Sequence, residues 1–173
     1  ISRGAYSVSS IAIEAIRQHR LDYFGKSICI LGAGTMGNRC LKKLHALGHP
    51  NLTISNRTMS TAQSLATEHQ ATCVDYNKIF SDLHNFDIII AAVAVQQPII
   101  FKKHLNLERS PLLIDLGLPR NIDPELDKHT DIKLINVDGL KDIASKNINR
   151  RQGELSKVNG IVDEEMHNLN QWY

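Results

Sequence analysis

The sequence predicts a doubly wound α/β fold with a parallel sheet, followed by a long C-terminal helix, and three observations carry this prediction. A short apolar run, Ser27–Leu31, ends in a glycine-rich turn that leads into an amphipathic helix. Further short apolar runs then alternate with helical patterns, which is typical of strands joined by crossover helices. The continuous run Ile88–Val93 is typical of a central parallel strand buried on both faces.

Composition is that of an ordinary globular protein with one sizeable core. The 173 residues are 42% hydrophobic and 22% charged, and the formal net charge of +2 is too small to argue for nucleic acid. No apolar stretch reaches membrane-spanning length. The first residue is not methionine and no signal peptide is visible, so we expect a piece of a longer, cytoplasmic protein.

Hydrophobic periodicity places the remaining elements along the chain. Strands are expected at Leu52–Ser55, Ala71–Val74, Pro111–Gly117 and Ile132–Val137. Helical segments are expected at Ser7–His19, Met59–His69, Asn77–Leu83 and Ile99–His104. Ligands of such sheets bind outside the carboxyl ends of the strands, where the strand order reverses. The segments that follow Leu31, Ser55, Val93 and Leu116 should therefore line one crevice.

The first strand ends at a motif that carries chemistry. Gly32, Gly34 and Gly37 have the G-x-G-x-x-G spacing of a dinucleotide-binding turn, and Gly48 stands where the following helix should end. The first glycine makes a tight turn, the second lets backbone amides reach a pyrophosphate, and the third lets helix and strand pack closely. The helix N-terminus offers N–H groups and a partial positive charge. This Rossmann-type pattern predicts a nucleotide cofactor; the alternative is a turn that binds nothing.

The end of the second strand indicates which nucleotide is bound. NAD-binding proteins place an acidic residue there, about 20 residues beyond the glycines, to bind the ribose hydroxyl. This chain has Asn56, Arg57 and Thr58 instead. A guanidinium pairs with a 2′-phosphate, whereas a carboxylate repels it, and Thr58 is suited to bond the phosphate and cap the next helix. The sequence predicts NADPH; the alternative is that Arg57 is a solvated loop residue.

Nine residues are predicted to bind the cofactor, and neither a catalytic residue nor a metal ligand is predicted within the chain. The predicted cofactor-binding residues are Gly32, Ala33, Gly34, Thr35, Met36, Gly37, Asn56, Arg57 and Thr58. The three cysteines, Cys29, Cys40 and Cys73, fall in predicted regular elements and are expected to be buried, reduced thiols. The eight histidines form no recognisable metal-binding set.

The pattern changes after Asp138. Apolar positions, with two polar interruptions, recur four and three residues apart at Ala144, Ile148, Arg151, Leu155, Val158, Val162, Glu165 and Leu169. A helix continuous to Gln171 would be about 50 Å long and should project away from the sheet. Gly153 and Gly160 leave open two shorter helices folded back on the sheet, because each glycine costs about 1 kcal/mol in a helix.

The loop after the fifth strand also holds charged residues whose role stays open. Asp115 and Arg120 bracket it. One interpretation places this loop near the nicotinamide or a domain junction. The other is structural: Arg120 and Asp123 tie the loop together while Asp115 accepts hydrogen bonds from backbone amides.

Several stretches together resemble the NADP-binding domain of the glutamyl-tRNA reductase family. They are Gly4–Ser10, Gly32–Gly37, Ser55–Thr58, Asp115–Pro124 and Val137–Ile143. The glycine motif and Asn-Arg-Thr are shared with shikimate dehydrogenases, whereas Leu118–Pro124 followed by a long helix is similar to the reductases specifically. The resemblance divides the chain into a leading helix or linker (1–22), the NADP-binding domain (23–138) and a long helix toward a dimerisation domain (139–173).

The resemblance implies an oxidoreductase whose catalytic domain lies outside this chain. In that family a cysteine of the N-terminal domain attacks the glutamyl ester of tRNA, and NADPH reduces the thioester to glutamate-1-semialdehyde for tetrapyrrole (porphyrin and heme) biosynthesis. The resemblance also implies that the whole protein is a V-shaped homodimer. On this basis the chain should bind NADPH, position the hydride and catalyse nothing alone.

One segment departs from the family pattern. Ala91, Ala92 and Val93 stand where such reductases have Ser-Ser-Thr, so three hydroxyls are missing. The change is either harmless or weakens NADPH binding, at about 0.5–1.5 kcal/mol per lost hydrogen bond. Two other functions stay open: the cofactor domain of a shikimate-type dehydrogenase, which predicts a short closing helix, and a non-catalytic Rossmann scaffold.

Overall fold

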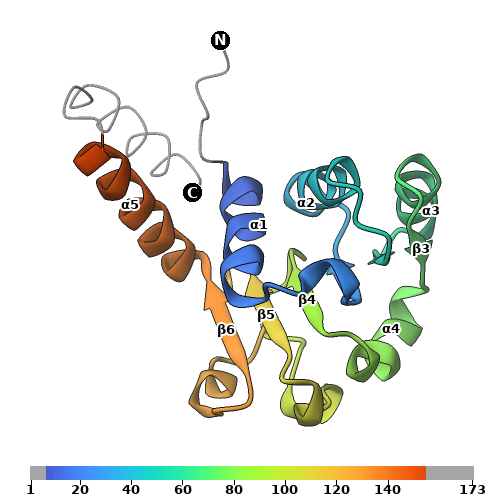
Figure 1. Cartoon of the computed structure of the whole chain (residues 1–173). Coiled ribbons are helices and arrows are strands. Elements are labelled where there is room, and N and C mark those ends of the chain that lie inside the picture. Colours follow the sequence, from blue (N-terminus) through green and yellow to red (C-terminus); the bar gives the residue numbers. More distant parts are fainter. Residues whose placement is uncertain (1–6, 155–173) are drawn as a thin grey trace.

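The computed structural model describes residues 7–154 and has a six-stranded parallel sheet at its centre (Figure 1). The strand order is β3-β2-β1-β4-β5-β6. The strands are β1 (Ile28–Leu31), β2 (Leu52–Ser55), β3 (Thr72–Cys73), β4 (Ile88–Ala91), β5 (Leu112–Asp115) and β6 (Lys133–Asn136). The α-helices are α1 (Val8–His19), α2 (Thr35–Ala46), α3 (Met59–Glu68), α4 (Tyr76–Asp82) and α5 (Val137–Glu154). The predicted doubly wound α/β fold is confirmed.

Two layers cover the sheet because successive strand residues point to opposite faces. In β1, Ile28 and Ile30 face a core formed with α1, α2, α3 and α5, whereas Cys29 and Leu31 face a second core. The second core is formed with α4 and with the 3₁₀ turns that follow β4 and β5. All residues of β1, β2, β4 and β5 are buried, which explains why these segments are apolar without alternation.

The caps of helices α1 and α2 are formed by residue types that favour helix ends. Ser7 caps α1, its hydroxyl accepting from the Ser10 amide at 3.2 Å. Gly48 has a positive φ of 79° just beyond α2 and donates to the His45 carbonyl, while the His49 amide donates to Leu44. This pair of bonds is the Schellman arrangement, so the expected C-terminal glycine is confirmed.

Several elements differ from their expected bounds; β3, β5 and α4, for example, are Thr72–Cys73, Leu112–Asp115 and Tyr76–Asp82. Ile99–His104 is not a helix: Ile100 pairs with Ile122, and only Lys102–His104 forms a 3₁₀ turn. The chain there is held by contacts to a distant loop, which local periodicity does not report. Strand β4 ends at Ala91, and Val137 begins α5 instead of ending β6.

The long C-terminal helix is described as far as Glu154. Its first turns do not project away, because Leu140, Ala144 and Ile148 are buried in the core that includes α1. Arg151 is exposed, and the helix continues through Gly153. The predicted seam from Leu155 onward and Gly160 lie outside the described residues.

Candidate functional site

The strand order reverses between β1 and β4, and the predicted crevice belongs at the carboxyl ends of these strands. The chain runs outward from β1 to β3 and then resumes at β4 on the other side of β1. Backbone bonds join the segments that leave these strands: Gly32 N–H donates to Ser55, Ala92 N–H to Leu31, and Leu116 N–H to Ala91, each at 2.8 Å. Four segments expected to share one edge are therefore brought together there.

The three glycines of the motif occupy positions that differ in how much room they leave for a side chain. Gly32 has a φ of +106°, and a side chain there would collide with the Ala92 carbonyl. A side chain on Gly37 would collide with the Gly32 carbonyl, because helix α2 crosses the turn at close range. Gly34 has an ordinary φ of −74°, and a Cβ there would meet no atom within 4 Å. The fold requires glycine at Gly32 and Gly37 but leaves open space over Gly34.

The N-terminus of α2 lies directly beyond Gly34. Gly34 occupies the N-cap position and supplies no side-chain cap, so the amides of the first turn meet no capping oxygen from that residue. Thr35 is exposed and Met36 is half-buried, whereas Ala33 is buried. The turn after β1 therefore leads into a helix N-terminus with open space in front of it. This is the geometry that binds a phosphate group.

Asn56 joins this turn to the end of β2. Its Oδ1 accepts from the Ala33 amide at 3.0 Å, and its Nδ2 donates to the Thr58 carbonyl at 3.2 Å. Thr58 takes the N-cap position of α3, but its hydroxyl makes no capping bond, so the expected cap by this side chain is wrong. The hydroxyl is exposed beside Arg57.

Arg57 is exposed, and it contacts the opposite side of the edge. Its Nη2 donates to the Ala94 carbonyl at 2.8 Å, beyond the end of β4. A cavity of about 310 Å³ lies beside it, lined by Asn56, Arg57, Met59, Asp75, Tyr76 and Asn77. The arginine is therefore a solvent-exposed cation at the rim of a hollow, reachable by an anionic group.

Sequence reasoning missed Asp75 and Tyr76 as part of this hollow. Both lie just after β3, beyond Val74, at the same edge of the sheet. Asp75 caps α4 by accepting from the Asn77 amide at 2.8 Å. The position after a strand was the available signal, because the carboxyl ends of parallel strands meet at one edge.

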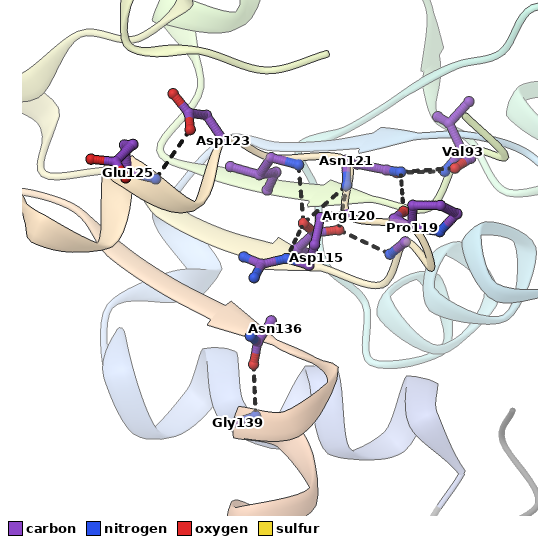
Figure 2. Close-up of polar contacts among 11 residues, drawn as sticks. Val93, Asp115, Pro119, Arg120, Asn121, Asp123, Glu125, Asn136 and Gly139 are labelled. Atoms are coloured by element: carbon purple, nitrogen blue, oxygen red, sulfur yellow. Dashed lines mark hydrogen bonds and ion pairs between the residues drawn. The ribbon is translucent and has the colours of Figure 1, made fainter. Parts of the chain in front are cut away.

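The loop after β5 is held by one buried carboxylate. Asp115 is 0% exposed, and its oxygens accept from the amides of Gly117, Asn121 and Ile122 at 2.9–3.1 Å. The Arg120 Nε lies 2.9 Å from the same carboxylate (Figure 2). The structural interpretation of Asp115 is therefore confirmed, and Arg120 pairs with it directly.

Asp123 does not tie this loop to Arg120. It caps the following 3₁₀ turn, accepting from the Glu125 amide at 3.1 Å. Asn121, to which the sequence assigned no role, is fully buried and bonds the backbone of Val93. A buried amide side chain requires partners, but its partner is 28 residues away and no local pattern identifies it.

The segment that departs from the family pattern is largely internal. Ala91 and Val93 are buried, and the Ala92 carbonyl lies against Gly32. The backbone of Val93 is paired through both its N–H and its C=O with the Asn121 side chain. The loss of the family's three hydroxyls therefore does not leave the N–H or C=O of Val93 without a partner.

Two of the three cysteines are buried, as expected, and Cys73 is not. Burial raises the pKa of the Cys29 thiol far above its usual value and that of Cys40 to about 12. Cys73 is only half-buried because β3 is a two-residue edge strand; burial and the nearby Asp75 raise its pKa. None of these thiols is activated as a nucleophile.

Other features of the described residues lie apart from this edge. A cavity of about 640 Å³ lies between α1, β6 and α5, with Gln18, Lys133 and Asp142 among its lining. Within 7–154, no cluster of three or more His, Cys, Asp or Glu side chains is placed to hold a metal ion. No helix of that range combines the length and apolarity needed to cross a membrane.

Comparison with known proteins agrees with this geometry. The chain is 38% identical to a glutamyl-tRNA reductase of Chlorobium phaeovibrioides over 99% of its own length and 42% of the relative. The structure of glutamyl-tRNA reductase from Methanopyrus kandleri superposes with a TM-score of 0.76 at 27% identity, covering 98% of this chain and 44% of that one.

A second solved structure is matched over nearly its whole length. The nucleotide binding domain of the Thermoplasma volcanium glutamyl-tRNA reductase has a TM-score of 0.65 at 25% identity, covering 84% of this chain and 96% of that one. The family model "Shikimate / quinate 5-dehydrogenase" matches residues 14–143. The chain therefore belongs to the shikimate/quinate 5-dehydrogenase family and resembles, over nearly all its length, one part of the glutamyl-tRNA reductases.

Proposed function

We propose that this chain is the NADPH-binding domain of a glutamyl-tRNA reductase. The observation that carries the proposal is Gly34. Its neighbours in the motif are glycines because the fold leaves no room for a side chain, whereas at Gly34 the fold leaves open space in front of the α2 N-terminus. A pyrophosphate requires that space and those amides.

Arg57 supports NADPH over NADH within this proposal. It stands at the end of β2, where NAD-binding proteins place a carboxylate, and its guanidinium is exposed at the rim of the 310 Å³ hollow. The nine predicted residues would hold the dinucleotide. Bound NADPH would supply hydride, and the chain's own part is to bind and orient it.

The relatives favour a reductase over a shikimate-type dehydrogenase. The similarity at 38% identity covers 99% of the chain, and helix α5 runs for 18 residues where the dehydrogenase alternative predicts a short closing helix. We further propose that the whole protein is a homodimer that acts on glutamyl-tRNA and reduces a glutamyl thioester to glutamate-1-semialdehyde, with this chain inactive alone.

Calorimetric titration of the chain with NADPH and, separately, NADH tests the cofactor assignment. We expect NADPH to bind at least about tenfold more tightly, a difference of about 1.4 kcal/mol. Arg57→Ala should remove that preference by weakening NADPH alone. Arg17→Ala, which deletes an equal charge on the exposed face of α1, is the matched control. Equal affinity of Arg57→Ala and the unmodified chain for NADPH would refute the role of this arginine.

A further inference from the structure

Asn121 binds both ends of one loop. The loop of residues 94–98, here called the β4 loop, leaves the sheet after Val93 and returns at Ile99. The Asn121 Oδ1 accepts from the Val93 amide at 2.7 Å, and its Nδ2 donates to the Val93 carbonyl at 2.8 Å. The Asn121 carbonyl accepts from the amides of Ile99 at 2.7 Å and Ile100 at 3.1 Å. A single buried residue therefore fixes where this loop begins and ends.

Just beyond the end of β4, the Asn121 side chain bonds the backbone of Val93 in place of a neighbouring strand. It presents one donor and one acceptor to the backbone of a single residue, as the directly opposed residue of a hydrogen-bonded antiparallel pair does. The chain can then leave the sheet at Val93 without burying unpaired polar groups. Asn121 is itself held from β5, because its amide donates to both oxygens of Asp115 at 3.1 Å.

The residues that lead into the β4 loop, and its first residue, contact the predicted cofactor residues. The Ala92 carbonyl and the Val93 side chain lie against Gly32, and the Ala94 carbonyl accepts from Arg57 at 2.8 Å. Figure 2 shows Val93 joined through Asn121 to Asp115, so a continuous set of contacts runs from β5 to the edge of the glycine turn.

We propose that Asn121 is a positioning residue for the cofactor, which fixes the β4 loop as the wall of the crevice opposite the adenosine side. A dinucleotide crosses a doubly wound sheet at the reversal of strand order, with one mononucleotide half on each side. Strand β2 lies on one side of β1 and β4 on the other, and the Arg57 side chain reaches from the end of β2 to the first residue of the β4 loop, Ala94. Asn121 thus acts on the nicotinamide half, and this inference rests on the proposed cofactor function.

The first test compares two ligands on two proteins. NADPH reaches both halves of the crevice, whereas 2′,5′-ADP reaches only the side of Arg57 and the glycine turn. We expect Asn121→Ala to weaken NADPH at least about tenfold and 2′,5′-ADP less than about twofold, measured well below the unfolding temperature. If Asn121→Ala only destabilised the fold, the affinities for the two ligands would fall equally or would both stay the same. Either result would overturn the inference. Binding of neither ligand to the unmodified chain would instead reject the proposed function.

The second test needs no variant, so it survives a failure of Asn121→Ala to fold. Hydrogen exchange of the unmodified chain is followed with no ligand, with NADPH and with 2′,5′-ADP. We expect NADPH to slow exchange at Val93, Gln96 and Gln97, and 2′,5′-ADP to affect only the peptide group of Ala94 and Val95, whose carbonyl bonds Arg57. Slowing by both ligands to the same extent, or by neither, would contradict a contact with the nicotinamide half.

Discussion

The glycine turn after β1 and the loop after β5 differ in how they supply partners for their backbone amides. Both are sharp turns at the carboxyl edge of the sheet, and both contain backbone amides that need partners. The turn is formed by the absence of side chains, and the N-cap residue of its helix offers no side-chain oxygen. The β5 loop is formed around the Asp115 carboxylate, which takes up the amides of Gly117, Asn121 and Ile122.

The comparison separates a site that can accept an anion from one that already contains one. Asp115 is an internal anion with a full set of donors, including Arg120. Amides used in this way are not available to a ligand. At the α2 N-terminus the corresponding space is open, so an external phosphate can occupy it. One loop is therefore expected to control stability and the other to control binding.

Removal of Asp115 should give the largest loss of stability. Asp115→Ala leaves Arg120 unpaired and three buried amides without an acceptor, so we expect the free energy of unfolding to fall by about 3–5 kcal/mol. Asp115→Asn keeps one acceptor and should lose less. Urea denaturation measures both, and Asp127→Ala, which alters an exposed carboxylate of the next turn, is the control. A loss for Asp115→Ala no greater than that of the control would remove the distinction between the two loops.

Substitutions within the glycine motif should separate stability from binding. Gly37→Ala forces a Cβ against the Gly32 carbonyl and should lower the free energy of unfolding by about 1–3 kcal/mol. Gly34→Ala places its methyl group in open space, so stability should change by less than about 0.5 kcal/mol. NADPH affinity of Gly34→Ala should nevertheless fall at least about tenfold, because the methyl group occupies the phosphate position. Thermal unfolding and calorimetric titration of the same two variants measure these effects; full NADPH affinity in Gly34→Ala would break the comparison.

The same difference explains which parts of the site could be predicted from sequence. The glycine motif can be recognised from its spacing, and Gly37 meets the Gly32 carbonyl within the same turn, although Gly32 also lies against the distant Ala92 carbonyl. The strands were also accessible, because a segment buried on both faces must be apolar throughout. The helix ends at Ser7 and Gly48 follow from equally local rules, whereas the strand order depends on pairing between distant segments.

The remaining features depend on contacts between distant residues. Asn121 acts on Val93 and Ile99, and Ile100 pairs with Ile122, so the predicted helix Ile99–His104 failed because a remote loop determines its conformation. The role of Asp115 stayed open for another reason: its partners, Gly117, Arg120, Asn121 and Ile122, are close in sequence, but the conformation of the loop that brings them to the carboxylate is not evident from residue types. Thr58 shows a different limit: the residue type at the N-cap was right, but its side chain makes no capping bond.

Asp87 provides a weaker version of the Asp115 arrangement at the opposite edge of the sheet, with a pH-dependent consequence. Its carboxylate accepts from the Ser27 amide and hydroxyl at 3.1 Å and from Arg109 at 3.2 Å. Burial raises the pKa of Asp87, but these hydrogen bonds outweigh it, so the pKa lies below its ordinary value. A group with a lowered folded-state pKa stabilises the fold above its unfolded value and loses that contribution as the pH falls through the folded one.

The free energy of unfolding should therefore decrease as the pH is lowered through and below about 4, the usual range of an aspartate. Asp87→Asn should be less stable near neutral pH and should lose less stability on acidification, which urea denaturation at a series of pH values measures. The effect should be the smallest of those described, because the Arg109 side chain is 42% exposed and its attraction is screened by solvent. Parallel pH profiles for the variant and the unmodified chain would show that the hydrogen bonds of Asp87 contribute no pH-dependent stability. The stabilising effect expected of Asp115 would then depend on its full burial.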